Sequence, residues 1–247
     1  MITGIIKGVS AYLRAFGVIS KLKLWKFFAV PMLISLVLAM IIGFITYGIS
    51  DNIGAYLGSF WPWEWGQETF ETIASVFGGL LIIAIGLILF KNTIMAISAP
   101  FVGPISKKIE VHMMGKDFSE KESSSWELLA RGTHVSIKNL IKELLWTVTI
   151  LLIGLIPVVG VVSAILLFLV QSYYAGFGNM DVTLERHFNY RESVRFVRKN
   201  RGLAIGNGML FILCLLIPIL GVIIVLPLSI TSATIITVEK IQQEKIL

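Results

Sequence analysis

Leu155-Ile156-Pro157-Val158-Val159-Gly160-Val161 is a short apolar stretch that the chain repeats as Leu216-Ile217-Pro218-Ile219-Leu220-Gly221-Val222. Each copy lies inside a long run without charged residues. Proline removes a backbone hydrogen-bond donor, and hydrocarbon offers no water to replace the lost bond. Both copies, with their Pro157/Gly160 and Pro218/Gly221 tips, therefore predict that a buried helix bends or reverses. Paired interruptions at corresponding points of a membrane chain point to a transport site.

The composition indicates a membrane protein. Of the 247 residues, 56% are hydrophobic and 15% are charged, and the mean hydropathy is +0.85. The run from Phe27 to Ser50 contains no charge. Water-soluble domains are not this apolar. We therefore expect an all-α integral membrane protein with a single membrane domain.

The charge distribution predicts the topology. None of the 21 Lys and Arg residues lies between Phe27 and Phe90. The connection from Asp51 to Glu71 holds four acidic residues and three tryptophans, which suits the outer interface. The N-terminus is then inside, residues 27–49 cross outward, and residues 72–90 return.

The two remaining apolar runs allow two interpretations. Residues 144–170 would form one helix of about 40 Å, which can cross a core of about 30 Å. Folded back at Pro157, each arm reaches only about 20 Å. The fold-back keeps the basic residues from Arg186 to Arg201 inside, in line with the positive-inside rule. We favour two transmembrane helices plus two re-entrant, hemi-penetrating hairpins; four plain spans are the alternative.

The expected organisation follows from these assignments. Its parts are an amphipathic N-terminal segment (1–26), a transmembrane helix (27–49), an outer loop (50–71), a second transmembrane helix with an extension (72–105), a cytoplasmic helical region (106–143), the first hairpin (144–170), a basic cytoplasmic segment (171–202) and the second hairpin (203–238).

The N-terminal segment has the pattern of a helix lying in the membrane interface. Polar residues on one side oppose an apolar stripe of Ile2, Ile5, Ile6, Val9, Tyr12, Leu13 and Phe16. Pairs of glycines four residues apart, at Gly4/Gly8, Gly54/Gly58 and Gly202/Gly206, hint at close helix packing.

Candidate anion-binding residues precede the first span. The segment Lys23-Leu24-Trp25-Lys26 can be an ordinary cationic flank with an interfacial tryptophan. It can also be an anion site, because a helix starting here would point free N–H groups and its positive end toward the same cations. Lys108, Glu110 and Arg191 are candidate pore or rim charges, for which a solvated surface is the plainer interpretation.

A basic stripe of Arg191, Arg195 and Arg198 lies between the hairpins at helical spacing. It could attract phospholipid headgroups, an anionic solute or nucleic acid. The stripe is short and tethered to the bilayer, so membrane lipids are expected as partners and nucleic acid is not.

Enzymatic motifs are lacking. The sequence has no phosphate-binding Walker loop and no Gly-x-Ser-x-Gly. His112, His134 and His187 lack ligand spacing and are expected at the surface, so we expect no metal and no cofactor. The four apolar runs contain no Asp, Glu, Lys, Arg or His, which disfavours a proton relay at membrane depth.

Several segments together resemble the CysZ-type sulfate permeases, part of the wider etoposide-induced-protein membrane family. They are Phe27-Phe28-Ala29-Val30-Pro31, Pro100-Phe101 through Lys108-x-Glu110, Met180-Asp181 through Asn200, and Ile217-Pro218 followed by Ser232-Ala233-Thr234. The resemblance implies a bacterial inner-membrane protein with two spans, two hemi-penetrating hairpins and oligomeric assembly. It also implies sulfate uptake for cysteine synthesis without nucleotide hydrolysis.

One segment departs from the family pattern. The family's sulfate site is associated with a Gly-Leu-Arg-Arg-like turn, and the aligned residues here are Lys23-Leu24-Trp25-Lys26. A lysine can balance an oxyanion but lacks the planar fork of arginine. Two hypotheses remain: an oligomeric oxyanion conduit, with sulfate as the expected substrate, and a non-transporting membrane scaffold or lipid-organising protein.

Overall fold

The computed structural model describes residues 1–58, 67–115, 125–154, 160–217 and 220–246. Over these ranges the regular structure is entirely helical, which confirms the all-α expectation. The helices are α1 (Ile2–Lys21), the 3-10 helix η1 (Trp25–Phe28), α2 (Ala29–Gly58), α3 (Gln67–Met114), α4 (Ser125–Gly154), α5 (Gly160–Leu184), α6 (Tyr190–Lys199), α7 (Arg201–Leu215) and α8 (Leu220–Ile246).

Five segments are long and apolar enough to cross a membrane by length and composition. They are Ile2–Lys21, Trp25–Ile45, Ile85–Met114, Gly160–Leu184 and Ile223–Glu244. Helix α7 is apolar but shorter. The chain is therefore a multi-pass membrane protein.

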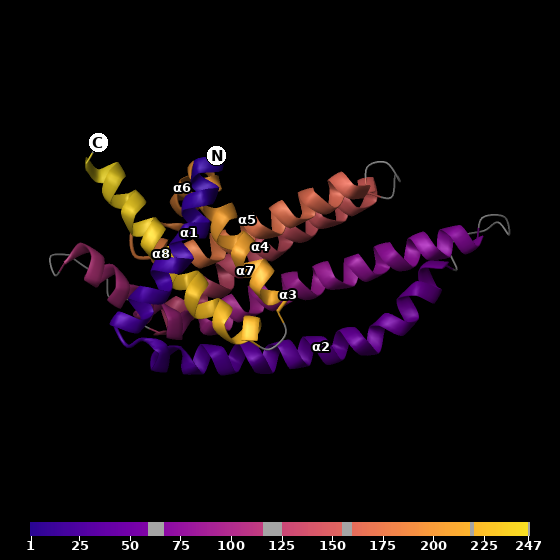
Figure 1. Ribbon diagram of the computed structural model, residues 1–247, viewed down its shortest axis with the longest axis horizontal. Coiled ribbons are helices and arrows are strands. Elements are labelled where there is room, and N and C mark those ends of the chain that lie inside the picture. The colour runs from indigo at the N-terminus through magenta and orange to yellow at the C-terminus, as the bar shows by residue number, and fades with distance from the viewer. Residues whose placement is uncertain (59–66, 116–124, 155–159, 218–219, 247) are drawn as a thin grey trace.

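Two pairs of helices project from the main body. Helix α2 lies beside α3, α4 lies beside α5, and both pairs extend in one direction, away from the two termini (Figure 1). Pro100 and Pro104 lie inside α3 without ending it. Val102, Ile105 and Ile109 of this stretch are buried in the largest hydrophobic cluster. Tertiary packing thus holds the helix through both prolines.

The two Pro/Gly segments coincide with breaks between helices. Helix α4 ends at Gly154 and α5 begins at Gly160, while α7 ends at Leu215 and α8 begins at Leu220. Gly160 and Gly221 thus lie in the first turn of the helix that follows. Pro157 and Pro218 lie outside the described residues. Within each pair the two helices contact one another.

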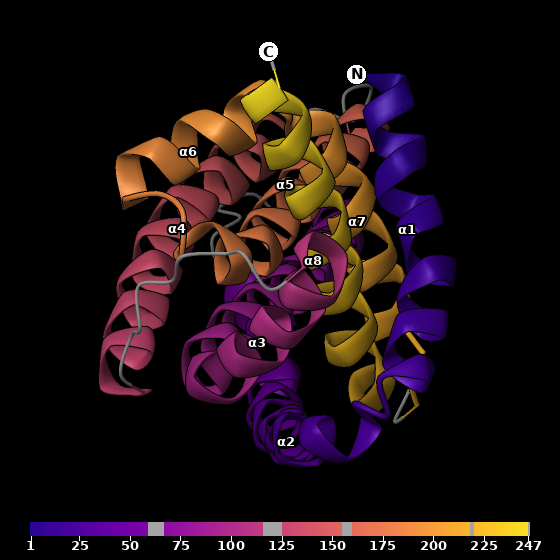
Figure 2. The same cartoon turned by 90° about the vertical axis from the view of Figure 1, so that its left-hand side faces the viewer.

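Helix α1 packs against the body through small side chains. It lies beside α7 and α8 (Figure 2). Its buried residues are Gly8, Ala11, Tyr12, Ala15 and Ile19. The large apolar residues Ile2, Ile6, Leu13 and Phe16 are exposed instead. Only Tyr12 of the predicted stripe is buried, so the contact face differs from the one that hydrophobicity alone predicted.

Glycines make this contact possible. A Cβ on Gly8 would lie 2.7 Å from the Leu203 carbonyl oxygen and 2.8 Å from the Asn207 nitrogen. A Cβ on Gly202 would lie 3.3 Å from the Gly4 Cα. The Gly4/Gly8 and Gly202/Gly206 pairs therefore face each other across the α1–α7 contact, and the hint from spacing is confirmed for these two pairs.

Candidate functional site

The turn between α1 and η1 is built around Lys23. This residue has a φ of 52°, in the left-handed region that glycine adopts most readily. The N–H of Lys23 donates to the Ser20 carbonyl at 3.2 Å, and that of Leu24 donates to the Ile19 carbonyl at 2.9 Å. Leu24 is 2% exposed and belongs to the main hydrophobic cluster. The buried Leu24 thus anchors the turn that carries the cations.

Lys26 and Lys108 approach the same aromatic ring. The Nζ atom of Lys26 lies 5.4 Å from the centroid of the Phe27 ring, and that of Lys108 lies 3.8 Å from it. Helix α3 thereby brings Lys108 to the segment that holds Lys26. Neither ammonium has a carboxylate partner among the residues that the structure describes.

Trp25 is fixed against α1 beside these cations. Its ring meets Phe16 edge-on with centroids 5.8 Å apart, and its Nε1 donates to the Ser20 hydroxyl at 3.3 Å. The indole therefore packs against the end of α1, and its N–H has a hydrogen-bond acceptor there.

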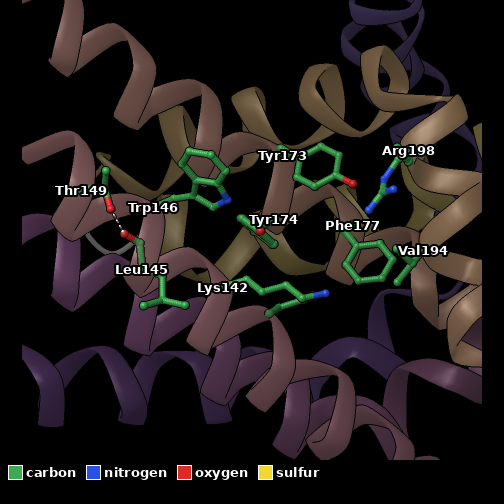
Figure 3. Close-up of a pocket in the computed structure, with 10 residues that line it drawn as sticks. Lys142, Leu145, Trp146, Thr149, Tyr173, Tyr174, Phe177, Val194 and Arg198 are labelled. Carbon is green, nitrogen blue, oxygen red and sulfur yellow. Dashed lines mark hydrogen bonds between the residues drawn. The ribbon is translucent and has the colours of Figure 1, made fainter.

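A second basic feature is a cavity of about 660 Å³ between α4, α5 and α6 (Figure 3). Its lining contains two cations, Lys142 and Arg198, and no carboxylate among the described residues. The other lining residues are Asn139, Leu145, Trp146, Thr149, Tyr173, Tyr174, Phe177 and Val194. Of the predicted arginine stripe, only Arg198 lines this cavity.

Helix α6 presents that stripe because its start is firmly capped. The Asn189 side chain accepts from the Glu192 N–H at 3.1 Å, and the Glu192 carboxylate accepts from the Asn189 N–H at 2.8 Å. This reciprocal capping box satisfies two N–H groups at the helix start. Arg191 is exposed in the first turn. Helix α6 lies at the same end of the body as the start of α1, whereas Lys23 and Lys26 follow the last residue of α1 at the other end, so Arg191 does not join them (Figures 1 and 2).

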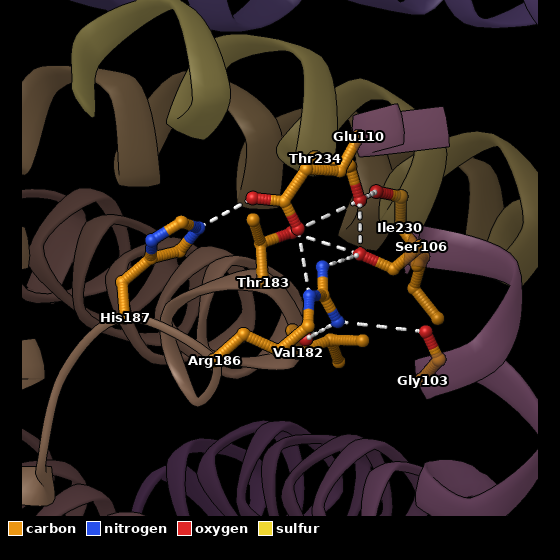
Figure 4. A network of polar contacts seen from close by, with 9 residues as sticks. All are labelled: Gly103, Ser106, Glu110, Val182, Thr183, Arg186, His187, Ile230 and Thr234. Atoms are coloured by element: carbon orange, nitrogen blue, oxygen red, sulfur yellow. Dashed lines mark hydrogen bonds and ion pairs between the residues drawn. The ribbon is translucent and has the colours of Figure 1, made fainter. Parts of the chain in front are cut away.

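Glu110 lies in a buried network rather than at an aqueous rim (Figure 4). It is 2% exposed, receives a hydrogen bond from the Nε of Arg186 at 2.7 Å, and contacts the Nε2 of His187. Arg186 also donates to the Ser106 hydroxyl at 2.8 Å. The prediction that Glu110 faces solvent is therefore wrong, as is the surface placement of His187. Two cationic or hydrogen-bonding groups from the α5–α6 connection compensate the burial of this carboxylate.

Three hydroxyl groups extend this network across the body. The Ser106 oxygen lies 3.0 Å from that of Thr183 and 2.9 Å from that of Thr234. These residues come from α3, α5 and α8, so the network ties three helices together at one level.

A third cluster surrounds Arg131 of α4. Its guanidinium donates to Asp181 at 3.2 Å and to the Ser193 hydroxyl at 3.1 Å, and lies 3.9 Å from a Glu185 oxygen. Burial, and next the neighbouring Asp181 charge, raise the pKa of Glu185 to about 8, against the opposing effect of Arg186 and Arg131. One guanidinium is therefore shared between two carboxylates at the end of α5.

Lys91 and Glu143 form a buried ion pair between α3 and α4. Their side chains are 3% and 0% exposed. The Lys91 ammonium also donates to the Gln171 carbonyl at 3.0 Å, and the Asn92 amide donates to Glu143 at 3.3 Å. This pair thus connects three helices through groups that would be costly to bury alone.

The chain matches a known family over most of its length. Residues 11–225 match the family model described as Sulfate transporter CysZ/Etoposide-induced protein 2.4. This chain belongs to the EI24 family. The resemblance drawn from the sequence is thereby confirmed.

Curated relatives of this EI24 chain are named transporters. A "Sulfate transporter CysZ" of Pseudomonas paraeruginosa is 28% identical over 220 residues, which cover 87% of each chain. One of Pseudomonas aeruginosa is 27% identical over the same length and coverage. One of Pseudomonas fluorescens is 28% identical over 158 residues, covering 61% of this chain and 62% of the relative.

The EI24 chain thus brings together only part of the predicted site. Lys26 and Lys108 meet at Phe27, and Lys23 shapes the adjoining turn. Leu24 contributes buried packing, so its side chain is not at the surface. Among the described residues, no group of three or more His, Cys, Asp or Glu side chains could hold a metal ion.

Sequence reasoning missed the Lys91–Glu143 pair and the cavity that holds Lys142 and Arg198. Lys91 and Glu143 each border an apolar run, where charges ordinarily flank a membrane helix, so neither position indicates a buried partner. Lys142 and Arg198 lie on different helices, and nothing in their spacing indicates that they meet.

Proposed function

We propose that this protein carries an inorganic oxyanion, sulfate above all, across a bacterial inner membrane for cysteine biosynthesis. Its relatives named "Sulfate transporter CysZ" support the substrate class. The proposal includes an oligomeric, channel-like path, a cytoplasmic N-terminus and re-entrant hairpins at the two Pro/Gly segments. Membrane lipids are further partners.

One observation carries the proposal: two ammonium groups without carboxylate partners meet at the Phe27 ring beside Lys23. The two ammonium groups lie 5.4 and 3.8 Å from the same ring centroid at an exposed position, so their positive fields add there. A bound oxyanion would balance this charge and accept hydrogen bonds from both lysines. The site is therefore better suited to an anion than to a cation.

The arrangement also accounts for the departure from the family's turn sequence. Where that turn has two adjacent arginines, this chain has Trp25 and Lys26. Lys108 on α3 would supply the second cation from another helix. The Lys23 conformation matches the glycine that the family has at this position, since glycine favours a positive φ.

Labelled-sulfate uptake into proteoliposomes tests the proposal. Lys26→Ala/Lys108→Ala should lower the uptake rate by about tenfold, the lower end of what electrostatic focusing contributes. The control is Arg195→Ala/Arg201→Ala, which also removes two exposed charges but from α6 and α7. It should transport as the wild type does.

Two outcomes would count against the proposal in different ways. Uptake that is unchanged in Lys26→Ala/Lys108→Ala would remove the site and leave transport standing. Wild-type uptake no greater than that of empty liposomes would favour a membrane scaffold instead.

A further inference from the structure

The cavity between α4, α5 and α6 combines positive charge with exposed apolar side chains. It contains Lys142 and Arg198 with no carboxylate among its described lining residues, so its field is positive. It also opens onto apolar side chains, because Leu145 and Trp146 of its lining are 65% and 53% exposed. Tyr173 and Tyr174 stand between the two regions (Figure 3).

We propose that this cavity binds an anionic phospholipid of the bilayer in which the protein lies. The phosphate group sits between Lys142 and Arg198, and the acyl chains leave past Trp146. This inference goes beyond oxyanion transport and does not depend on it.

The charges inside the cavity are available for a ligand. Neither Lys142 nor Arg198 forms an ion pair within the described part of the chain. The nearby carboxylate of Glu143 is buried and paired with Lys91. Lys138 adds a further cation at the edge, since its Nζ and that of Lys142 lie 4.5 and 5.9 Å from the Tyr190 ring centroid.

The apolar surroundings favour a lipid over a free oxyanion. A cavity of about 660 Å³ is of the size that holds drug-sized ligands, well beyond an inorganic ion. Leu145, Val148 and Leu152 form an exposed stripe that leads along α4 for about 10 Å, given 1.5 Å per residue. A free ion would make no use of this stripe, whereas an acyl chain can lie along it.

The aromatic residues fit the same ligand. Tryptophan and tyrosine are enriched where headgroups meet acyl chains, because each joins an apolar ring to a polar group. Trp146, Tyr173 and Tyr174 occupy that position between the cationic end of the cavity and the apolar stripe.

Native mass spectrometry of the full-length protein, titrated in detergent with phosphatidylglycerol or phosphatidylcholine, tests the assignment. The wild type should retain phosphatidylglycerol in preference to phosphatidylcholine. Lys142→Gln/Arg198→Gln should bind phosphatidylglycerol about 25-fold more weakly, because each cation near an anionic headgroup is worth about fivefold. Lys142→Arg/Arg198→Lys, which keeps both charges, should bind as the wild type does.

The control variant Arg195→Gln/Arg201→Gln loses the same charge outside the cavity. Equal loss of phosphatidylglycerol in both charge-removing variants would mean general surface attraction and would overturn the proposal. Displacement of the lipid by sodium sulfate, but not by sodium chloride of equal ionic strength, would assign the cavity to free oxyanions instead.

Thermal melting of each variant identifies one that has unfolded. In that case Trp146→Ala provides a second test, since it should weaken lipid retention without changing the charge.

Discussion

The contact of α1 with α7 predicts opposite effects for the same substitution at two glycines of one helix. Gly8 faces backbone atoms of α7, and a Cβ there would lie 2.7, 2.8 and 3.0 Å from Leu203 O, Asn207 N and Gly206 C. Gly17 has no atom within 4 Å of a Cβ. Both positions lie inside α1, so alanine brings the same gain in helix propensity, about 0.5–1 kcal/mol.

The steric clash determines whether Gly8→Ala stabilises or destabilises the protein. An ordinary contact begins at 3.4 Å, so the Leu203 carbonyl must retreat by about 0.7 Å from its 2.7 Å position. The obstacle is backbone, which cannot turn aside as a flexible side chain can. Overpacking of this kind costs about 1–3 kcal/mol. Gly8→Ala should therefore destabilise the protein by about 1–2 kcal/mol, and Gly17→Ala should stabilise it by about 0.5–1 kcal/mol.

Thermal melting of the purified protein in detergent measures both effects. At about 2–4 °C per kcal/mol for a chain of this size, Gly8→Ala should lower the Tm by about 2–8 °C. Gly17→Ala should raise it by about 1–4 °C. Equal shifts of the same sign would refute the close α1–α7 contact. They would favour the predicted helix that rests on the membrane surface through its large apolar residues.

Three further predictions concern stability. Lys91→Met or Glu143→Leu alone should cost about 3–5 kcal/mol by leaving a buried charge unpaired, while the double variant should recover most of the Tm. Because the pKa of Glu185 is raised to about 8, the folded state holds its proton more tightly than the unfolded state. The protonated Glu185 carboxyl therefore stabilises the folded state fully below about pH 4.5, and this contribution is lost as the pH rises to 8. The Tm should fall over this pH range in the wild type and fall less in Glu185→Gln. Lys23→Gly should raise the Tm by about 1–3 °C, since a lysine at a φ of 52° is strained; a clear fall would contradict the strain.

The amino-acid sequence predicts the helices and their interruptions well, because those depend on local chemistry. The breaks after Gly154 and Leu215 fall where proline and glycine interrupt apolar runs. The cationic turn at Lys23 to Lys26 also lies where the charges indicated. Local patterns decide both features, since backbone donors and charges act within a few residues.

The partners of buried charges could not be predicted in the same way. Glu110 is close to Lys107 and Lys108 in the sequence, which suggested a solvated surface. On a helix of 3.6 residues per turn, however, residues two apart, such as Lys108 and Glu110, point in nearly opposite directions. Lys108 thus reaches Phe27 at the surface, while Glu110 turns inward to Arg186 and His187. Only the packing of α3 against the α5–α6 connection decides this, and single-sequence patterns do not report it.

The two repeated Pro/Gly segments join helices of unequal character, although their sequences are alike. In the 18-residue apolar stretch of α8, 72% of the residues are buried, against 39% in the corresponding stretch of α5. Ser229, Thr231, Ser232, Thr234 and Thr237 are all fully buried in α8. Small and hydroxyl-bearing side chains allow close helix approach and hydrogen bonds inside a membrane protein.

The α4–α5 pair, by contrast, exposes large apolar side chains. Val161, Val162, Ile165 and Leu166 of α5 are large, apolar and exposed, as are Leu145 and Leu152 of α4. Lipid or a second copy of the chain can cover such a face without any hydrophobic penalty, whereas water cannot. The repeat therefore coincides with the break in each helix pair, and the residues flanking it decide which pair is buried in the body and which exposes an apolar face.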